Sequence, residues 1–330
     1  MSVKVSGSDG VDQSQVTGST QIPVGTTAQR PANPEAGMMR FNTDTGQIEG
    51  YNIFDNGWQQ MSDFFARISA TGGTVTDIAQ DGQLFRVHTF TSDGVFEVTR
   101  GGEVEYLVVA GGGGGGDRPD AGSNRRAGGG GAGGLLSGVQ TINPNAYSVI
   151  AGLGGSGAFA QDDGEDGEDS TVFGITAFGG GGGAEGGGNN PGRSGGSGGG
   201  ACAGTSGGLV PGGSGVEGQG NDGGDFPDPD NVRNCGAGGG GAGEKGGTPT
   251  SSGDGAPGGD GVANTITGTN VFYAGGGAGS DNGGLTEAGG IGGGGGGAPE
   301  TSGEPNTGGG GSALSGNGGS GIVIVRYRIG

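Results

Sequence analysis

The chain is poor in the residues that build ordinary hydrophobic cores and ordinary active sites. Only 28% of its 330 residues are apolar and 5% are aromatic, too few for a conventional side-chain core throughout a chain of this length. His88 is the only histidine, which argues against a His-based catalytic triad, and no two-Cys, two-His zinc spacing is present. We therefore expect a protein that is not an enzyme, with no catalytic residues, no metal and no cofactor.

Basic residues are also scarce. The 14 Lys and Arg face 34 Asp and Glu, giving a net charge of −20, whereas nucleic-acid binding needs clustered positive charge. No segment approaches the roughly 20 apolar residues of a membrane span. The N-terminus, MSVKVSGSDG, lacks the apolar stretch of a signal peptide. Cys202 and Cys235 are expected as free thiols of a protein made in the cytosol, with a disulfide between them left open.

Glycine, in contrast, is abundant and unevenly distributed. Residues 1–100 contain 12 of the 97 glycines, so residues 101–330 are more than one-third glycine. Such a region is either a disordered linker or a structure ordered by backbone packing. Short apolar strands precede many of the glycine runs, as in YLVVA before Gly111–Gly116 and NVFYA before Gly275–Gly277. A linker has no need of such anchors, which favours the ordered structure.

Four segments follow from this composition. Residues 1–20 are polar and are predicted to form an N-terminal arm. Residues 21–60 carry short β-like apolar positions separated by turn signals such as Asp44-Thr45-Gly46, which predicts a small antiparallel meander that would be stabilised in an oligomer. Residues 61–80 are predicted to be a connector, and residues 81–330 a glycine-rich domain.

The glycine-rich domain begins and ends with predicted strands. Alternation around Asp93-Gly94 predicts a hairpin that pairs Phe85–Thr91 with Val95–Arg100, and Val104–Ala110 follows as a buried strand. The closing run at 321–327 is another strand. Strands are therefore expected over residues 85–110 and 321–329.

Polyglycine II helices offer a way to order the glycine runs between these strands. They have three residues per turn, rise about 3.1 Å per residue and make no internal hydrogen bonds, so their N–H and C=O groups pair with neighbouring rods. Each such bond contributes about 1 kcal/mol, against roughly 0.5–1 kcal/mol for ordering a glycine rather than an alanine. The predicted fold is mainly β plus polyglycine II: a small N-terminal β-module, then a β-scaffold carrying a bundle of glycine-rich polyglycine II helices, with almost no α-helix.

Several motifs resemble those of bacteriophage tail-fibre proteins and adhesins that have a glycine-rich C-terminal domain. The matching segments frame residues 81–330: FTSDGVFEV, VEYLVVAGGGGGG, YSVIAGLGGSG and GGSGIVIVRYR. Residues 25–52, GTTAQRPANPEAGMMRFNTDTGQIEGYN, together with Trp58, look like a short module common in phage tail and fibre proteins.

This resemblance implies a virion structural protein, a tail fibre or receptor-binding adhesin whose far-end loops recognise the host surface. It would be synthesised in the host cytoplasm, bind other virion tail or fibre proteins through its N-terminal region, and form a homo-oligomer, with a trimer as one option. Its receptor would be a glycan or an outer-membrane protein. The alternative is a purely structural virion fibre or decoration protein without a receptor.

Polar inserts between the glycine runs are the candidate receptor contacts. The insert at 117–127 concentrates arginines in an acidic chain, and the insert at 221–234 has a phenylalanine in a proline-stiffened loop. The candidates are Arg118, Asn124, Arg125, Arg126, Phe226, Asp228, Asn231 and Arg233. The alternatives are a solvated turn for the first insert and a capping role at the end of the bundle for Phe226.

Two further sets of residues have simpler interpretations. Residues 161–169, QDDGEDGED, hold six carboxylates but match no EF-hand or calcium β-roll spacing, so we expect an exposed acidic loop. Phe41, Tyr51 and Trp58 are expected to form a small core or an attachment and oligomer interface. Paired carboxylates for glycan hydrolysis stay an open alternative, because acidic residues are abundant.

Overall fold

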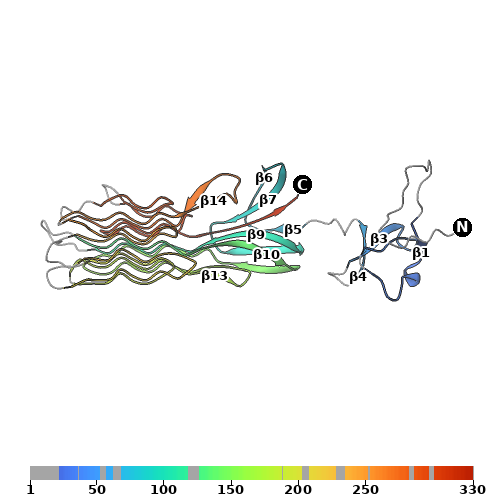
Figure 1. The fold of residues 1–330 in the computed structure, drawn as a ribbon, viewed down its shortest axis with the longest axis horizontal. Coiled ribbons are helices and arrows are strands. Elements are labelled where there is room, and N and C mark those ends of the chain that lie inside the picture. Colours follow the sequence, from blue (N-terminus) through green and yellow to red (C-terminus); the bar gives the residue numbers. More distant parts are fainter. Residues whose placement is uncertain are drawn as a thin grey trace, which may run out of the picture. The chain divides into compact units, whose positions relative to one another are not determined.

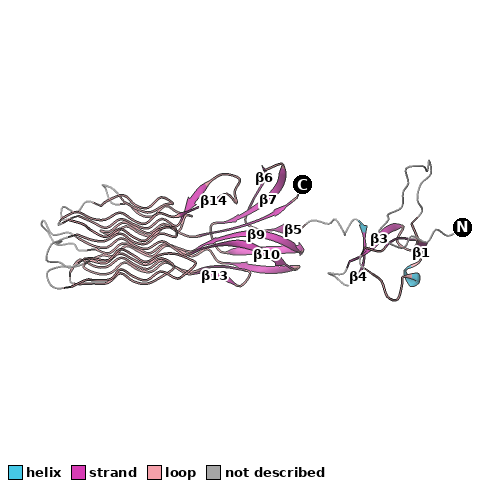
Figure 2. Cartoon of the chain, viewed as in Figure 1, coloured by secondary structure: helices cyan, strands magenta, loops and turns pink. Residues whose placement is uncertain are grey.

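The computed structural model describes residues 22–35, 37–52, 57–61, 68–117, 126–187, 189–202, 208–227, 235–251, 253–281, 286–296 and 301–329. The chain divides into two compact units, residues 1–66 and 67–330. As predicted, the described part is mainly β (Figures 1 and 2). None of the helical structure within it is long and apolar enough to cross a membrane. The predicted arm at 1–20 lies outside the described residues.

The first unit contains a four-stranded sheet in the order β1-β2-β3-β4. Its strands are β1 (Val24–Gly25), β2 (Met39–Asn42), β3 (Gln47–Asn52) and β4 (Gly57–Gln60). The last three form the predicted antiparallel meander, and a tight turn ending at Gly46 joins β2 to β3. A feature not predicted is β1, which pairs with β2 in parallel and is followed by a 3-10 helix, η1 (Thr27–Gln29).

The second unit is built around a five-stranded antiparallel sheet in the order β10-β9-β16-β7-β6, and a three-stranded sheet in the order β11-β8-β5. The five strands are β6 (Thr74–Gln80), β7 (Gln83–Phe90), β9 (Gly102–Val109), β10 (Leu135–Ile142) and β16 (Ile322–Arg328). The three are β5 (Ser69–Thr71), β8 (Gly94–Arg100) and β11 (Asn145–Val149). Two hairpins complete the base: β12 (Ser170–Val172) with β13 (Ile175–Ala177), and β14 (Val262–Asn264) with β15 (Val271–Tyr273).

The predicted strands over 85–110 and 321–329 are present as β7, β8, β9 and β16, but the predicted hairpin is wrong. β7 pairs with β6 and β16, whereas β8 pairs with β5 and β11 in the other sheet. Phe90 and Phe96 belong to the same core cluster, with ring centroids 6.4 Å apart, so the two strands meet face to face. Each phenylalanine ring is most completely buried when it lies between the two sheets. The segment at Asp93 therefore leads the chain from the sheet that contains β7 to the sheet that contains β8.

The connector predicted over 61–80 is wrong for residues 69–80, which form β5 and β6. The true hairpin here joins β6 to β7 through the two residues Asp81 and Gly82, with φ of 51° and 75°. Positive φ at both central residues is what a two-residue hairpin turn of the common kind requires. The sequence thus holds two Asp-Gly pairs in this region, and the first of them forms the hairpin.

The central strand β16 is buried on both faces. Val323, Val325 and Tyr327 contribute to the cluster that contains Phe96, while Ile322 and Ile324 contribute to a second cluster on the opposite face. This alternation follows the two-residue period of a strand. The sheets therefore concentrate the few large apolar side chains at the base of the glycine rods.

The glycine runs form a bundle of extended rods without strand or helix assignment, packed side by side at one end of the sheets (Figures 1 and 2). The run at 111–116 demonstrates the repeat. Its N–H groups donate at 2.8 to 3.1 Å to three neighbouring segments, residues 165–168, 316–319 and 128–131. Successive residues donate to these segments in turn, so residues three apart in the run donate to the same segment. Its carbonyls accept at 2.8 to 2.9 Å from three more: residues 155–158, 180–183 and 311–314. A three-residue repeat with six neighbours is the packing expected of polyglycine II.

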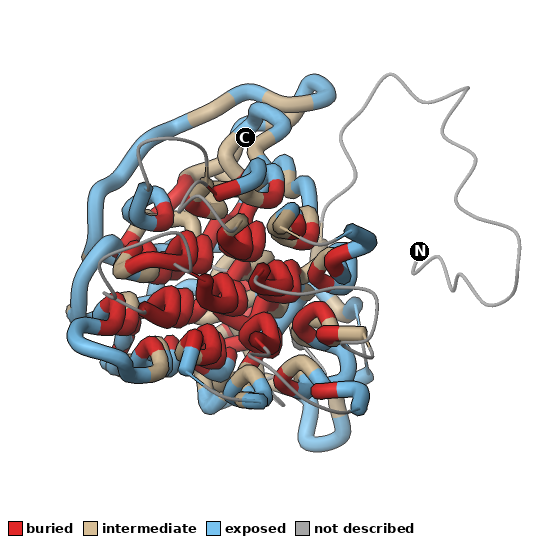
Figure 3. Tube along the Cα trace, turned by 90° about the vertical axis from the view of Figure 1, so that its left-hand side faces the viewer, coloured by how far each residue is buried: buried red, intermediate tan, exposed pale blue. Residues whose placement is uncertain are grey.

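The rods are close enough to exclude side chains from the interior. A Cβ placed on Gly115 would lie 1.8 Å from the carbonyl oxygen of Ser312, and one on Gly114 would lie 2.0 Å from that of Ser156. Viewed along the rods, the central ones are buried and the exposed residues lie around the perimeter (Figure 3). Backbone hydrogen bonds therefore replace side-chain burial as the cohesive contact in this half of the unit.

Candidate functional site

A buried carboxylate organises the first unit. Glu49, on β3, is only 1% exposed, and its oxygens accept hydrogen bonds from Arg30 at 2.6 and 3.1 Å and from Asn42 at 2.9 Å. The Arg40 Nε lies 3.4 Å from the same carboxylate. The hydrogen bonds from Arg30 are the largest cause that lowers the pKa of Glu49, and Glu49 in turn raises the pKa of Arg30. Glu49 therefore stays ionised and joins strands β2 and β3 to the loop after η1.

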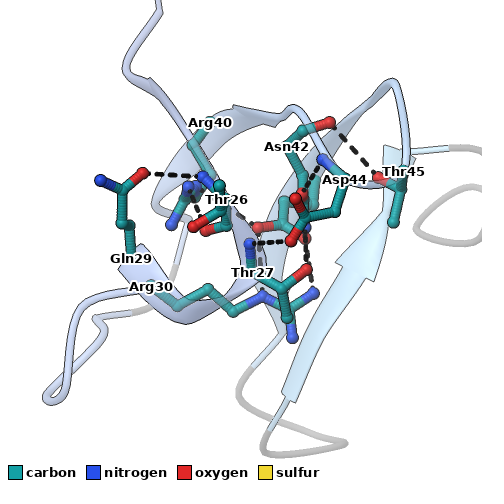
Figure 4. Close-up of polar contacts among 9 residues, drawn as sticks. Thr26, Thr27, Gln29, Arg30, Arg40, Asn42, Asp44 and Thr45 are labelled. Atoms are coloured by element: carbon teal, nitrogen blue, oxygen red, sulfur yellow. Dashed lines mark hydrogen bonds and ion pairs between the residues drawn. The ribbon is translucent and has the colours of Figure 1, made fainter.

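The loop around η1 is held to this centre by backbone contacts (Figure 4). Arg40 donates to the carbonyl of Thr26 at 2.8 Å, and the Asp44 carboxylate accepts from the N–H of Thr27 at 2.8 Å. Gln29 accepts from the N–H of Thr26 at 2.8 Å, closing a capping box at the start of η1. These contacts fix residues 26–29 against Arg40 and Asp44 although this part of the chain has few apolar residues.

The three aromatic residues predicted as an interface occupy different places in this unit. Tyr51 and Trp58 are a cross-strand pair with ring centroids 5.8 Å apart, and Phe41 lies opposite Ile48 in the strand register. All three are partly exposed. Trp58 also lines a groove of about 370 Å³ with Val24, Pro31, Met38 and Met39. Of the three, Trp58 is thus the one that borders an apolar surface depression.

The acidic stretch at 161–169 is not an irregular loop from Asp163 onward. Asp163, Asp166 and Asp169 lie on a rod and accept hydrogen bonds from the backbone N–H groups of Glu185, Gly182 and Gly179, at 2.7 to 2.9 Å. The glycines between them, Gly164 and Gly167, face the central rod. The Asp-Gly-Glu repeat of three residues was the sequence signal for this arrangement. Among the described residues no group of three His, Cys, Asp or Glu could hold a metal ion.

The ends of the rods farthest from the sheets meet in a group of hydrogen bonds that we call the distal cluster: Ala127, Cys202, Gly236 and Ser280. The N–H of Ala127 donates to the Ser280 hydroxyl at 2.7 Å, and the N–H of Gly236 donates to the Ser280 carbonyl at 2.8 Å. Cys202 and Gly236 form an isolated β-bridge. Each member lies within two residues of a stretch outside the described part: 118–125, 203–207, 228–234 or 282–285.

Two of the eight predicted receptor contacts fall on described residues, and both are buried. Arg126 is 4% exposed and donates to the carbonyl of Gly186 at 3.0 Å. Phe226 is 0% exposed and packs with Val210 and Cys235. This burial argues against both as contact residues, and it fits the alternative in which Phe226 closes the end of the rods. Arg118, Asn124, Arg125, Asp228, Asn231 and Arg233 lie outside the described residues.

The predicted insert boundaries also need correction. Within 221–234, Asn221 and Gly224 accept hydrogen bonds from Gly198 and Ala201, so residues 221–226 belong to a rod. Within 117–127, Ala127 belongs to the distal cluster. Asparagine, aspartate and alanine occur in the rods where they face the perimeter or a rod end. Composition alone therefore assigned residues of the rods to the inserts.

Both cysteines are buried close to each other, and no disulfide joins them. The Cys202 thiol lies 3.5 Å from the carbonyl oxygen of Cys235, while the Cys235 thiol is directed at the carbonyl of Ser251 at 3.8 Å. Burial raises the pKa of the Cys235 thiol to about 11. The expectation of thiols without a disulfide agrees with this geometry, and both side chains are buried packing residues at the distal end of the rods.

Comparison with known proteins assigns the second unit to a family. A family model described as a glycine-rich domain matches residues 89–328, which include the sheets from β8 onward and all the rods. No curated protein matches the chain. Since the family model spans well over half of the sequence, the chain belongs to the glycine-rich domain family.

Proposed function

We propose that this protein is a bacteriophage virion component, a tail fibre or receptor-binding adhesin that recognises the host surface without catalysis. The observation that carries the proposal is the distal cluster, since four separate stretches of the chain begin or end at residues that hydrogen-bond to one another at one end of the rods. A scaffold of this kind brings the described ends of these four stretches together. Binding elements are commonly loops positioned by a rigid scaffold.

The rods suit this role because their cohesion does not depend on the sequence of those segments. The hydrogen bonds of residues 111–116 are made entirely by backbone groups. Substitutions in the stretches at 118–125 and 228–234 therefore leave the scaffold contacts in place. The net charge of −20 limits unspecific adhesion to anionic envelopes, so that recognition depends on local contacts and on avidity from several copies.

The N-terminal unit is proposed as the attachment and oligomerisation module. The partly exposed pair of Tyr51 and Trp58, and the groove that Trp58 lines with Met38 and Met39, supply an apolar surface for another virion protein or a second copy. The partners in this proposal are tail or fibre proteins at this unit and a host glycan or outer-membrane protein at the distal end.

The test is binding of the labelled full chain to a panel of bacteria, beside a variant in which residues 118–125 and 228–234 are replaced by Gly-Ser segments of equal length. Arg126, Phe226 and the distal cluster are left intact, so the rods keep their contacts. Binding that is lost in a variant with an unchanged thermal transition supports the adhesin. Absence of binding to every strain supports the purely structural fibre or decoration protein instead.

A further inference from the structure

A groove on the side of the rod bundle has the size and the lining of a ligand site. It has a volume of about 500 Å³ and is lined by Asp166, Asp169, Phe178, Ser194, Ser214 and Val216. Pockets for small ligands fall in this size range. The residues come from three different rods and from the segment after β13, so the groove is a product of the tertiary fold.

Phe178 is exposed although its backbone is fixed on both sides. Its N–H donates to the Gln219 side chain at 2.9 Å, and its carbonyl accepts from Gly134 at 2.8 Å. The residue is nevertheless 43% exposed. In a chain with so few aromatic residues, a ring held at a groove by a rigid backbone offers a flat apolar face, and the electron-rich face of an aromatic ring attracts the polarised C–H bonds of a sugar.

The polar groups of the groove retain unused hydrogen-bonding capacity. Asp169 uses Oδ1 to accept from Gly179 at 2.8 Å, and no donor of the described residues contacts its Oδ2. Ser194 accepts from the N–H of Ser214 at 3.1 Å, which leaves its hydroxyl hydrogen available. The groove therefore presents both acceptors and hydroxyl donors beside an aromatic ring.

The negative charge of the groove limits which class of ligand can bind there. The groove carries two carboxylates, of which Asp166 is paired with Arg193 at 2.7 Å, while no cation among the described residues pairs with Asp169. Added to a net charge of −20, this disfavours uronic acids, sialic acids and phosphorylated sugars. An uncharged ligand rich in hydroxyl groups can donate to Asp169 and accept from Ser194 and Ser214.

We infer that this groove binds a neutral pyranose residue of a surface glycan, with Phe178 stacked on the sugar ring and Asp169 accepting from its hydroxyl groups. The inference deepens the proposed function and rests on it for its biological meaning. It places a glycan subsite on the side of the bundle, apart from the segments at the distal cluster. A single sugar unit held by one ring and a few hydrogen bonds has a Kd on the order of 1 mM.

The first experiment is a saturation-transfer NMR titration of the full chain with the methyl glycosides of glucose, galactose and N-acetylglucosamine, and with methyl glucuronide as the anionic comparator. We expect saturable binding of at least one neutral glycoside and none of the glucuronide. Phe178→Ala should weaken binding at least tenfold, whereas Phe178→Trp should retain it. Phe272→Ala, a change at a 39% exposed phenylalanine on β15, is the matched control and should have no effect.

The inference is overturned if no neutral glycoside binds saturably, or if Phe272→Ala and Phe178→Ala weaken binding equally while both variants keep the parental thermal transition. The cell-binding assay separates this result from the proposed function. A chain that binds bacteria but no glycoside refutes the groove and leaves the adhesin standing. A chain that binds glycosides through Phe178 but binds no bacterium supports the groove and counts against the adhesin.

Discussion

The carboxylate of Asp166 accepts a hydrogen bond from the backbone N–H of Gly182 at 2.9 Å on the perimeter of the rod bundle. In the interior, a rod's N–H donates to the carbonyl of a neighbouring rod, as Gly113 does to Gly131. At the perimeter the neighbour is missing, and the aspartate side chain supplies the acceptor. Asp225 does the same for Gly212 at 3.0 Å, so perimeter capping by aspartate recurs in the bundle.

Replacing the capping aspartates should therefore loosen the rod at 179–185. Asp166→Ala removes an acceptor from a backbone N–H and should lower the free energy of unfolding by about 1 kcal/mol. Asp166→Asn keeps an oxygen acceptor and should cost less. Chemical denaturation of the full chain measures both. Equal losses for the two variants would mean that the ion pair with Arg193, and not the cap, is the stabilising contact.

Interior glycines of the rods should not accept even one methyl group. Gly115→Ala places a Cβ about 1.8 Å from the Ser312 carbonyl oxygen, and neither backbone can move without breaking several hydrogen bonds. We expect a loss of about 3 kcal/mol or failure to fold. Gly187→Ala is the control, since its Cβ would meet only the flexible end of Glu185. Thermal unfolding of the soluble variants tests this prediction. A Gly115→Ala variant with the parental Tm would contradict the close packing of the rods.

Glu49 should control the stability of the first unit. Glu49→Gln leaves Arg40, which is buried, without its anion, and should destabilise the unit by about 3 kcal/mol. Trp58 is the only tryptophan in the chain, so its fluorescence reports unfolding of this unit. Glu35→Gln, at an exposed position of the same unit, is the control and should leave the transition unchanged.

The same residue predicts an acid transition. Because the folded-state pKa of Glu49 lies below its ordinary value of 4.5, its contribution is complete at neutral pH and is lost as the pH falls through the folded pKa. The midpoint of Trp58 fluorescence in denaturant should stay constant from pH 7 to pH 5 and then fall. A Glu49→Gln variant whose midpoint falls as steeply as that of the wild type below pH 5 would show that another group is responsible.

His88 should confer a separate pH dependence on the second unit. Its Nδ1 lies 2.7 Å from the Gly72 carbonyl and must donate to it, so Nε2 accepts from the Tyr327 hydroxyl at 3.2 Å in the neutral ring. Burial is the main cause that lowers its pKa below 6.5, so stability is complete above that value and declines as the pH falls further. The Tm should fall between pH 7 and pH 5, and His88→Gln should remove most of this slope. An unchanged slope in that variant would assign the effect to other groups.

Much of the architecture could be predicted from the sequence because it rests on local chemistry. Glycine runs behind short apolar strands predicted rods of polyglycine II, since only glycine allows backbones to approach on all sides. The strands at 85–110 and at 321–329 followed from their apolar character. The meander of the first unit followed from its turn residues, whereas for Trp58 the sequence left a small core and an interface as alternatives.

Strand pairing was not predictable in the same way. The pairs Asp81-Gly82 and Asp93-Gly94 look alike as turn signals, yet the first closes a hairpin and the second carries the chain between sheets. The difference lies in the burial of Phe90 and Phe96, which is most complete when their strands face each other. That choice depends on β16 at the far end of the sequence, which pairs with β7 and β9.

The same distinction between local chemistry and tertiary contacts applies to the candidate site. The sequence by itself determined that the chain would be acidic, poor in side-chain core and rich in rods, because composition limits what can be buried. Only the tertiary structure decided that Arg126 and Phe226 are buried, that Asp163, Asp166 and Asp169 cap a neighbouring rod, and that Phe178 borders a groove. In a polyglycine bundle every rod has up to six neighbours, and which of them are present depends on contacts between residues distant in the chain.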